Sequence, residues 1–226
     1  MKKQLIILFF IFLSSYAQAH TSHYEGIIKI EMDVLRNNEI IGYSNYFFEH
    51  ENDMMTVKNY TKFKVKLFGA TIFSISSEGL EEYKNDKLIS FKSTTFQNDK
   101  EKYVNLKYNN DKKKFTIKGS SYTGEANPDC VIGNWWNHKL LEADQQISPL
   151  SGSIKDQIVI FIGEENINLY GKNYLANHYK LKSKDENIPS DKKLDFDIWV
   201  SKKNNLILKV SYKKMGDWEY RLKSYQ

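Results

Sequence analysis

The sequence predicts an all-β protein: a large, strongly curved antiparallel meander, open or closed like a barrel, with one short helix on its concave side. Apolar and polar residues alternate with a period of two in most segments, as at Ile28, Ile30 and Met32. Short turns rich in Asn, Asp and Lys separate these segments, which is typical of hairpins between antiparallel neighbours. About a dozen such strands cannot stay in one flat sheet, because strand twist makes a large sheet curl, close or split.

Residues 1–19 have the pattern of a secretory signal peptide. Two lysines precede an apolar run at 5–13 that is too short to span a bilayer, and AQA at 17–19 supplies the small residues that a signal peptidase reads. No cysteine follows the apolar run, so no lipoprotein anchor is expected. We therefore expect a soluble periplasmic protein whose mature chain begins at His20 and forms a single all-β domain over residues 20–226.

The first half of the mature chain is expected to form strands joined by tight turns. These turns are RNNE at 36–39, END at 51–53, KND at 84–86, QNDK at 97–100 and NNDKKK at 109–114. One strand carries a ladder of lysines on the face opposite its apolar residues: Lys58, Lys62, Lys64 and Lys66. The ladder predicts a solvated outer face that also blocks unwanted strand pairing. The functional alternative is peripheral contact with an anionic membrane surface.

The alternation stops at residues 119–152, a stretch that we call the insert. It contains the segment NWWNHKLL, in which Asn134 can cap a short helix by accepting hydrogen bonds from the amides of the first turn. Trp136 and Leu140 then share one face at helical spacing. The sequence therefore predicts one helix over residues 134–143, which plugs or covers the concave side of the sheet.

Strands return after the insert. QIVIFIG at 157–163 is apolar on both faces, and such a strand is usually covered on both sides. The strands expected to follow read NINLYG, NYLANHYKLK, LDFDIWV, NLILKVSY and DWEYRLKSY. A charged loop at 183–193 and a tight turn at 202–205 lie between them. No break in composition marks a linker, so one domain is expected.

Ordered patterns along the chain resemble a family of exported bacterial proteins, domain-of-unknown-function family six-one-three-four. They are LRNNEIIGYSNYFFE with Gly42, EGLEEYKNDKLISFKSTT, GNWWNHKLL, FDIWVSKKNNLILKVSY with Trp199, and GDWEYRLKSY. The likeness covers about residues 24–226, although Tyr83 stands where a tryptophan is expected and residues 203–205 replace a glycine turn. The resemblance implies a fold and an exported location but no activity. By analogy of fold it points to half-barrel proteins that carry lipids or hydrophobic molecules.

The sequence contains no recognisable catalytic motif: no G-x-S-x-G elbow, no H-E-x-x-H, no P-loop and no G-x-G-x-x-G. Glu78, Glu81 and Glu82 come nearest to paired carboxylates. Glu81 and Glu82 are neighbours that point to opposite faces of a strand, so a solvated edge is expected. The lone Cys130 is expected to be buried, and its spacing from His138 specifies no nucleophile and base. We therefore expect a protein that is not an enzyme and holds no cofactor.

Copper(II) binding is one alternative function. Removal of the signal peptide makes His20 a terminal amine and imidazole chelate, with His23 nearby, and nitrogen ligands suit copper(II). A functional site needs a further imidazole from His50, His138 or His178, and the sequence places none of them nearby. The competing interpretation is a frayed terminus with incidental histidines. No metal site is assigned on this basis.

Aromatic side chains are the main candidates for a binding surface, since the chain has four Trp, fifteen Tyr and thirteen Phe. We expect Trp135, Trp136, Leu140 and Trp199 to line the concave side, with plain core packing as the alternative. The leading hypothesis is binding of a lipid or other hydrophobic ligand under the insert. The second is a protein interaction or structural module of the envelope, which an exposed sheet edge would favour. A net charge of +5 is too small to indicate nucleic acid.

Overall fold

The structure, a computed structural model, describes residues 23–226, so the expected signal peptide and His20 lie outside the described residues. The first eight strands are β1 (Lys29–Arg36), β2 (Glu39–Glu51), β3 (Met54–Leu67), β4 (Ala70–Lys84), β5 (Lys87–Gln97), β6 (Lys100–Asn109), β7 (Lys114–Gly119) and β8 (Thr123–Ala126). The rest of the fold is β9 (Val131–Ile132), the 3-10 turn η2 (His138–Leu141), β10 (Gln145–Ile147), β11 (Ile154–Leu169), β12 (Lys172–Ser183), β13 (Asp195–Ser201), β14 (Ile207–Lys213) and β15 (Asp217–Tyr225).

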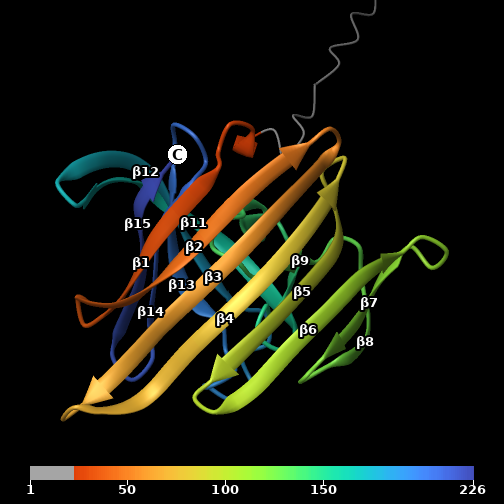
Figure 1. The fold of residues 1–226 in the computed structure, drawn as a ribbon. Helices are drawn as coiled ribbons and strands as arrows, with labels where there is room; N and C mark the ends of the chain where they lie inside the picture. The colour runs from red at the N-terminus through yellow and green to blue at the C-terminus, as the bar shows by residue number, and fades with distance from the viewer. Residues whose placement is uncertain (1–22) are drawn as a thin grey trace, which may run out of the picture.

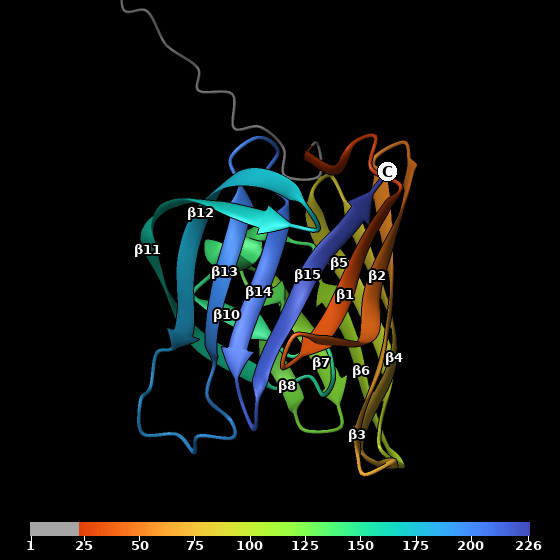
Figure 2. The same cartoon turned by 90° about the vertical axis from the view of Figure 1, so that its left-hand side faces the viewer.

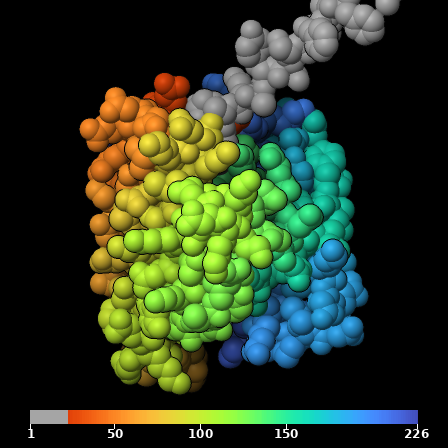
Figure 3. All heavy atoms as spheres, turned by 90° about the vertical axis from the view of Figure 1, so that its right-hand side faces the viewer, coloured from red at the N-terminus to blue at the C-terminus, as the bar shows by residue number. Residues whose placement is uncertain are grey.

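All fifteen strands belong to one sheet, in the order β8-β7-β6-β5-β4-β3-β2-β1-β15-β14-β13-β12-β11-β10-β9. Neighbouring strands are antiparallel, except that β9 and β10 pair in parallel. Figures 1 and 2 show the long strands wrapping around an interior. In Figure 3 the green side chains of β6–β8 lie beside the teal side chains of the later segment, where the two ends of the sheet approach. The predicted all-β, strongly curved antiparallel meander is confirmed, and the sheet does not close.

Asparagine and aspartate form the tight turns because they tolerate left-handed backbone conformations. Asn37 and Asn38 join β1 to β2 with φ of 49° and 64°, and Asn85 and Asp86 join β4 to β5 with φ of 46° and 65°. Two-residue turns of this mirror-image kind match the right-handed twist of the flanking strands. The local sequence therefore fixes these hairpins.

Gly42 marks a point of close approach between strands. It lies between Val34 of β1 and Phe63 of β3, and the register of β1 and β2 shifts just beside it. A Cβ at Gly42 would lie 2.0 Å from the backbone oxygen of Lys62. Only glycine fits here, and the adjacent bulge increases the local twist that curls the sheet.

The helix expected over residues 134–143 is a single 3-10 turn, η2. Its cap is Asn137, whose side chain accepts a hydrogen bond from the Lys139 amide at 3.0 Å, and not Asn134. The prediction failed because short strands before and after the turn pair with each other, and a helix this short depends on such tertiary contacts. Within residues 23–226, no helix has the length and apolar character needed to cross a bilayer.

The insert fills the interior of the curved sheet. Trp136 and Leu140 join the largest core cluster, which draws residues from strands at both ends of the chain. Cys130 belongs to a second cluster with Phe91 and Ile117, while Leu150 packs against a third. The insert is therefore a plug whose side chains complete the core.

Candidate functional site

Two of the expected lining residues are buried deep in the core. Trp136 has an exposed fraction of 1 % and Leu140 of 0 %. The rings of Tyr24, Phe48 and Tyr83 meet the Trp136 indole edge to face, with centroids 4.8, 5.3 and 5.8 Å away. These contacts match the packing interpretation of Trp136 and Leu140, which hold the plug against the sheet.

A buried carboxylate anchors the plug. Glu81 of β4 is 1 % exposed, and its Oε1 accepts hydrogen bonds from Asn134 Nδ2 at 2.6 Å and Trp136 Nε1 at 2.8 Å. The Tyr83 hydroxyl donates to Oε2 at 2.5 Å. Burial raises the pKa of the Glu81 carboxyl above its usual range, although the three donors oppose that shift. The expectation of a solvated edge was wrong for Glu81, because its face of β4 meets the plug.

Trp135 also points inward and forms no flat external patch. Its ring lies 5.0 Å from Phe196 and 5.9 Å from Tyr220, measured between centroids, and Tyr212 continues the row 5.3 Å beyond Phe196. Burial raises the pKa of Tyr220 to about 12. All four rings keep partial solvent exposure, unlike Trp136. This row of rings therefore lies nearer to solvent than Trp136 does.

Trp199 lies on the outer face of the sheet, so the expectation that it lines the concave side was wrong. Side chains alternate along β13, and Phe196 faces the plug, which places Trp199 on the opposite face. Its ring stacks on His178 at 4.3 Å, and Lys209 Nζ lies 3.7 Å from the ring centroid. The indole Nε1 donates to Glu165 Oε1 at 2.6 Å.

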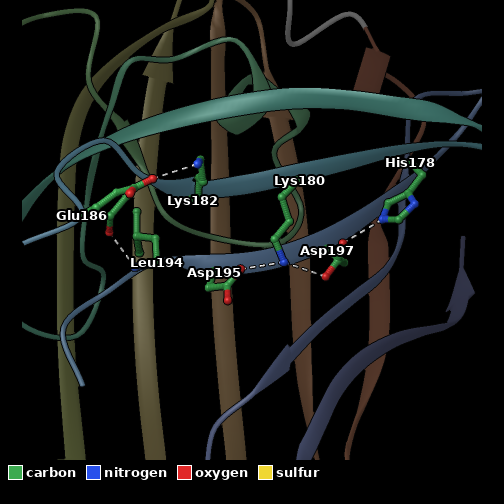
Figure 4. Close-up of polar contacts among 8 residues, drawn as sticks. His178, Lys180, Lys182, Glu186, Leu194, Asp195 and Asp197 are labelled. Carbon is green, nitrogen blue, oxygen red and sulfur yellow. Dashed lines mark hydrogen bonds and ion pairs between the residues drawn. The ribbon is translucent and has the colours of Figure 1, made fainter. Parts of the chain in front are cut away.

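Polar contacts between β12 and β13 lie on the same outer face as Trp199, and Figure 4 shows those of His178, Lys180, Asp195 and Asp197. His178 Nε2 lies 2.9 Å from Asp197 Oδ1, and Lys180 Nζ lies 2.9 Å from Asp197 Oδ2 and 2.6 Å from Asp195 Oδ1. These contacts lower the pKa of Asp197, against the opposing effect of burial. We call His178, Lys180, Asp195 and Asp197 the outer network.

The outer network borders an open polar cleft of about 870 Å³ on the outside of β13–β15. The lining residues are Asn37, Asn38, Lys180, Asp195, Asp197, Ser211, Tyr212, Lys213, Asp217, Trp218 and Glu219. Its charged groups pair with each other or with neighbours, as Lys180 does with both aspartates and Glu219 does with Arg221. This arrangement links the charges of β12, β13 and β15 in pairs across the outer face.

Cysteine and histidine do not combine into a reactive centre. Cys130 is buried, its thiol donates to Gln145 Oε1 at 3.4 Å, and burial raises the pKa of that thiol. His138 lies in another part of the core, with its ring 5.1 Å from that of His23. Burial lowers the pKa of His138 to about 4. Across residues 23–226 no group of three or more His, Cys, Asp or Glu could hold a metal ion, and the copper hypothesis depends on His20, outside that range.

The sequence reasoning missed a free sheet edge on β11. Residues 154–156 of β11 pair with β10, but residues 158–169 pair only with β12 among the described strands. Figure 2 shows β11 at the margin of the sheet. Four apolar side chains here are exposed: Ile158 (38 %), Ile160 (41 %), Phe161 (55 %) and Ile162 (56 %). The expectation of cover on both faces was wrong for these four residues, although Val159 between them packs against the core.

Comparisons with known proteins agree with this fold. The family model described as Domain of unknown function (DUF6134) matches residues 32–223. No curated protein matches the chain. A solved structure described as a β-barrel-like protein of Domain of Unknown Function DUF1849 from Brucella abortus has a TM-score of 0.60 and 9 % sequence identity, and the alignment covers 88 % of this chain and 97 % of that chain. At this identity the likeness shows the fold alone, and neither comparison indicates a catalytic family.

Proposed function

The chain belongs to the DUF6134 family, and we propose that it is an exported, non-enzymatic binding module of the cell envelope that captures an extended segment of a partner protein on the free edge of β11. One observation carries this proposal: residues 158–162 combine an unpaired backbone edge with exposed apolar side chains. Export to the periplasm is supported by the signal-peptide pattern of residues 1–19.

A free, apolar sheet edge is a surface that soluble proteins normally avoid. Unpaired N–H and C=O groups form a template for another strand, and natural sheets protect such edges with charges, bulges or covering elements. Residues 158–162 contain no charged residue and no proline, and the register with β12 shifts only at Ile162, at the end of this stretch. An added strand would satisfy the backbone groups, while Ile158 and Ile160 on one face and Phe161 on the other would contact alternate side chains.

The strand that fits this edge comes from another protein and not from a second copy. A twofold pairing centred on Ile160 would run the second copy past residue 157 into the position that β10 already occupies beside residues 154–156. A twofold pairing centred between Gly163 and Glu164 would bring the Glu164 and Glu165 carboxylates of both copies together, and like charges across strands repel. A short partner segment avoids both conflicts.

The charges beside the edge define the chemistry of the partner. In antiparallel pairing, the residues that precede the partner's apolar run lie next to Glu164, whose side chain is 48 % exposed and pairs with Lys202 through one carboxylate oxygen. A lysine or arginine at that point would face the carboxylate. We therefore expect an extended, apolar, proline-free segment with a basic residue on its N-terminal side.

A synthetic peptide tests this proposal. The probe is a peptide of alternating valine and threonine that begins with lysine, and binding is measured by fluorescence anisotropy with the mature chain. We expect saturable binding, together with slower hydrogen exchange of the amides of residues 158–162, because edge pairing protects them. A peptide that begins with glutamate should bind at least tenfold more weakly.

The variant Ile160→Lys places a charge on the edge and should abolish peptide binding. Ile40→Lys is the matched control, because Ile40 is 59 % exposed but belongs to β2, which has strands on both sides. Equal binding by the two variants would refute the proposal, and so would unchanged exchange at residues 158–162. A dimer that is lost in Ile160→Lys would instead identify a second copy as the occupant.

A lipid or other hydrophobic ligand inside the barrel is the second candidate function. It is favoured by the partial exposure of inward-facing Trp135, Phe196, Tyr212 and Tyr220 on one side of the plug. Native mass spectrometry of protein purified from its own periplasm tests it. A bound mass that is lost in Trp135→Ala supports this candidate, whereas a ligand-free protein removes it.

A further inference from the structure

We propose that the tip of the β3–β4 hairpin docks this protein onto an anionic lipid bilayer, with the Phe68 ring inserted between lipids and Lys62, Lys64 and Lys66 at the level of the headgroups. The hairpin ends at the lower left of Figure 1. Phe68 at its tip is 100 % exposed, and Leu67 and Ile72 beside it are 53 % and 49 % exposed. We call Leu67, Phe68 and Ile72 the apolar tip.

The turn at the tip holds Phe68 in an unfavourable backbone conformation. Phe68 has φ of 49° and Gly69 has φ of 82°, so both lie in the left-handed region. A left-handed conformation is unfavourable for a bulky residue. The β1–β2 turn uses Asn37 and Asn38 at such positions, where the conformation is less unfavourable. A contact of the Phe68 ring outside the chain would offset this unfavourable conformation.

The β11–β12 turn also has an aromatic residue followed by glycine, but its aromatic side chain makes a contact within the chain. Tyr170 and Gly171 have φ of 50° and 82°, close to the values of Phe68 and Gly69. This hairpin bends across the outside of the sheet (Figure 2), and the Tyr170 hydroxyl donates to Asp33 Oδ2 at 2.7 Å. The aromatic residue of one tip therefore has a partner within the chain, whereas Phe68 lies wholly in solvent.

Three lysines follow the apolar tip up the outer face of β3. Phe63 and Val65 are buried, so Lys62, Lys64 and Lys66 alternate with them and point outward. On the neighbouring β4, Lys62 and Lys64 face the uncharged Ser76 and Ser74. None of the three forms an ion pair within residues 23–226, whereas Lys58, farther from the tip, pairs with Glu49 at 2.6 Å.

The spacing of apolar and basic residues fits the interface of a bilayer. Strand residues advance by about 3.3 Å each, so Lys66, Lys64 and Lys62 lie roughly 7, 13 and 20 Å from Phe68 along the strand, and Lys62 meets the headgroups when the strand is tilted toward the bilayer surface. Apolar groups of interfacial proteins reach about 5–10 Å below the headgroups. The apolar tip would therefore lie among the upper acyl chains while the lysines meet the anionic headgroups, a charge complementarity that favours a lipid surface over an apolar protein groove.

Vesicle binding tests this proposal with the mature chain. The probes are vesicles of phosphatidylglycerol mixed with phosphatidylethanolamine, and vesicles of phosphatidylcholine alone. We expect cosedimentation with the anionic vesicles, weakening as salt is raised, and little with the neutral ones. The variant Lys62→Gln, Lys64→Gln, Lys66→Gln should weaken partitioning about a hundredfold, at roughly fivefold per lost charge near the surface.

The matched control removes three exposed lysines that lie on the outer face of β5, β6 and β7: Lys92→Gln, Lys107→Gln, Lys118→Gln. It has the same net charge as the first variant and should bind within about threefold of the unmodified chain, because charges more than a Debye length from the surface are screened. Equal losses in the two triple variants would overturn the proposal by showing that only net charge matters.

The variant Phe68→Trp reports insertion directly. Its tryptophan emission should be quenched by lipids brominated on their upper acyl chains, by more than the native tryptophans of the unmodified chain. Phe68→Ser should lose at least tenfold in partitioning without loss of thermal stability, because the fully exposed Phe68 ring contributes no packing to the fold. Absence of vesicle binding or of extra quenching overturns the proposal. Peptide binding by the β11 edge is measured separately with Ile160→Lys, so either proposal can fail alone.

Discussion

Two tryptophans of this protein each donate a hydrogen bond to a glutamate, Trp136 in the interior and Trp199 beside the outer network, but the two glutamates differ in burial. Inside, Trp136 donates its indole N–H to Glu81, whose other partners are the neutral Asn134 and Tyr83. Outside, Trp199 donates to Glu165, and its ring lies beside His178 and Lys209. Glu81 is 1 % exposed, whereas the Glu165 side chain is 45 % exposed.

The comparison shows that burial decides which force holds each tryptophan. In the interior, burial raises the pKa of the Glu81 carboxyl and its described partners are uncharged, so packing and hydrogen bonds hold the plug. On the outer face water solvates the charges, so ion pairs add little and respond to salt. Stability should therefore depend strongly on the interior anchor and weakly on the outer network.

The largest effect is expected from Trp136→Ala. Loss of this fully buried ring leaves a cavity beside Tyr24, Phe48 and Tyr83 and removes one donor from Glu81, and such truncations cost about 3–5 kcal/mol. Urea unfolding followed by circular dichroism measures the change in the free energy of unfolding. A loss below about 1 kcal/mol would show that the plug is not part of the cooperative core.

Glu81→Ala should cost less than Trp136→Ala but still about 2–3 kcal/mol, because it leaves the donors of Asn134, Trp136 and Tyr83 without their acceptor. Glu81→Gln is the matched control: its amide oxygen can accept from Asn134 and Trp136, and its amide N–H can donate to Tyr83. Urea unfolding at pH 7 should therefore place Glu81→Gln close to the unmodified protein. Equal losses in the two variants would contradict the role assigned to these hydrogen bonds.

The contribution of Glu81 to the free energy of unfolding should decrease as pH rises. Because burial raises its pKa in the folded state, the unfolded chain releases this proton first, and the folded state holds the extra proton above pH 4.5. The stabilising contribution is complete below the unfolded pKa and is lost as pH rises through the folded pKa. The stability of the unmodified protein relative to Glu81→Gln should therefore fall from pH 4.5 upward. The opposing effect of His138, whose pKa is lowered to about 4, is common to both proteins and cancels in the difference.

The smallest effect is expected from Asp197→Asn in the outer network. The substitution weakens the contacts to His178 and Lys180, but the side chain is 32 % exposed, so the loss should be about 1 kcal/mol or less. Unfolding measured at low and high salt should show the difference shrinking with salt, while the effect of Trp136→Ala stays constant. A salt-independent loss above about 2 kcal/mol in the free energy of unfolding would contradict the expectation that the outer network contributes less to stability than the interior contacts.

Local sequence patterns predicted the strands and turns well, because both depend on neighbouring residues. Alternating apolar residues identified β1 and β3, and Asn37–Asn38 identified a hairpin turn before any contact was known. The resemblance to the DUF6134 family was also confirmed. The candidate site was predicted less well: Trp199 was assigned to the wrong face, and the exposed edge of β11 was expected to be covered.

The sequence by itself determined an all-β chain of hairpins with one irregular insert, since the period of two and the left-handed turn residues act over a few residues. The alternation of Asp195 and Asp197 with Phe196 and Ile198 already indicates which face of β13 looks inward. Only the tertiary structure decided that Trp199, on the face of the aspartates, is covered by His178 and Lys209. It also decided that Glu81 meets Trp136, 55 residues along the chain, and that Ile158, Ile160, Phe161 and Ile162 stay exposed among the described residues. Those outcomes depend on how far the whole sheet curls and on where its ends stop, and no local pattern encodes either.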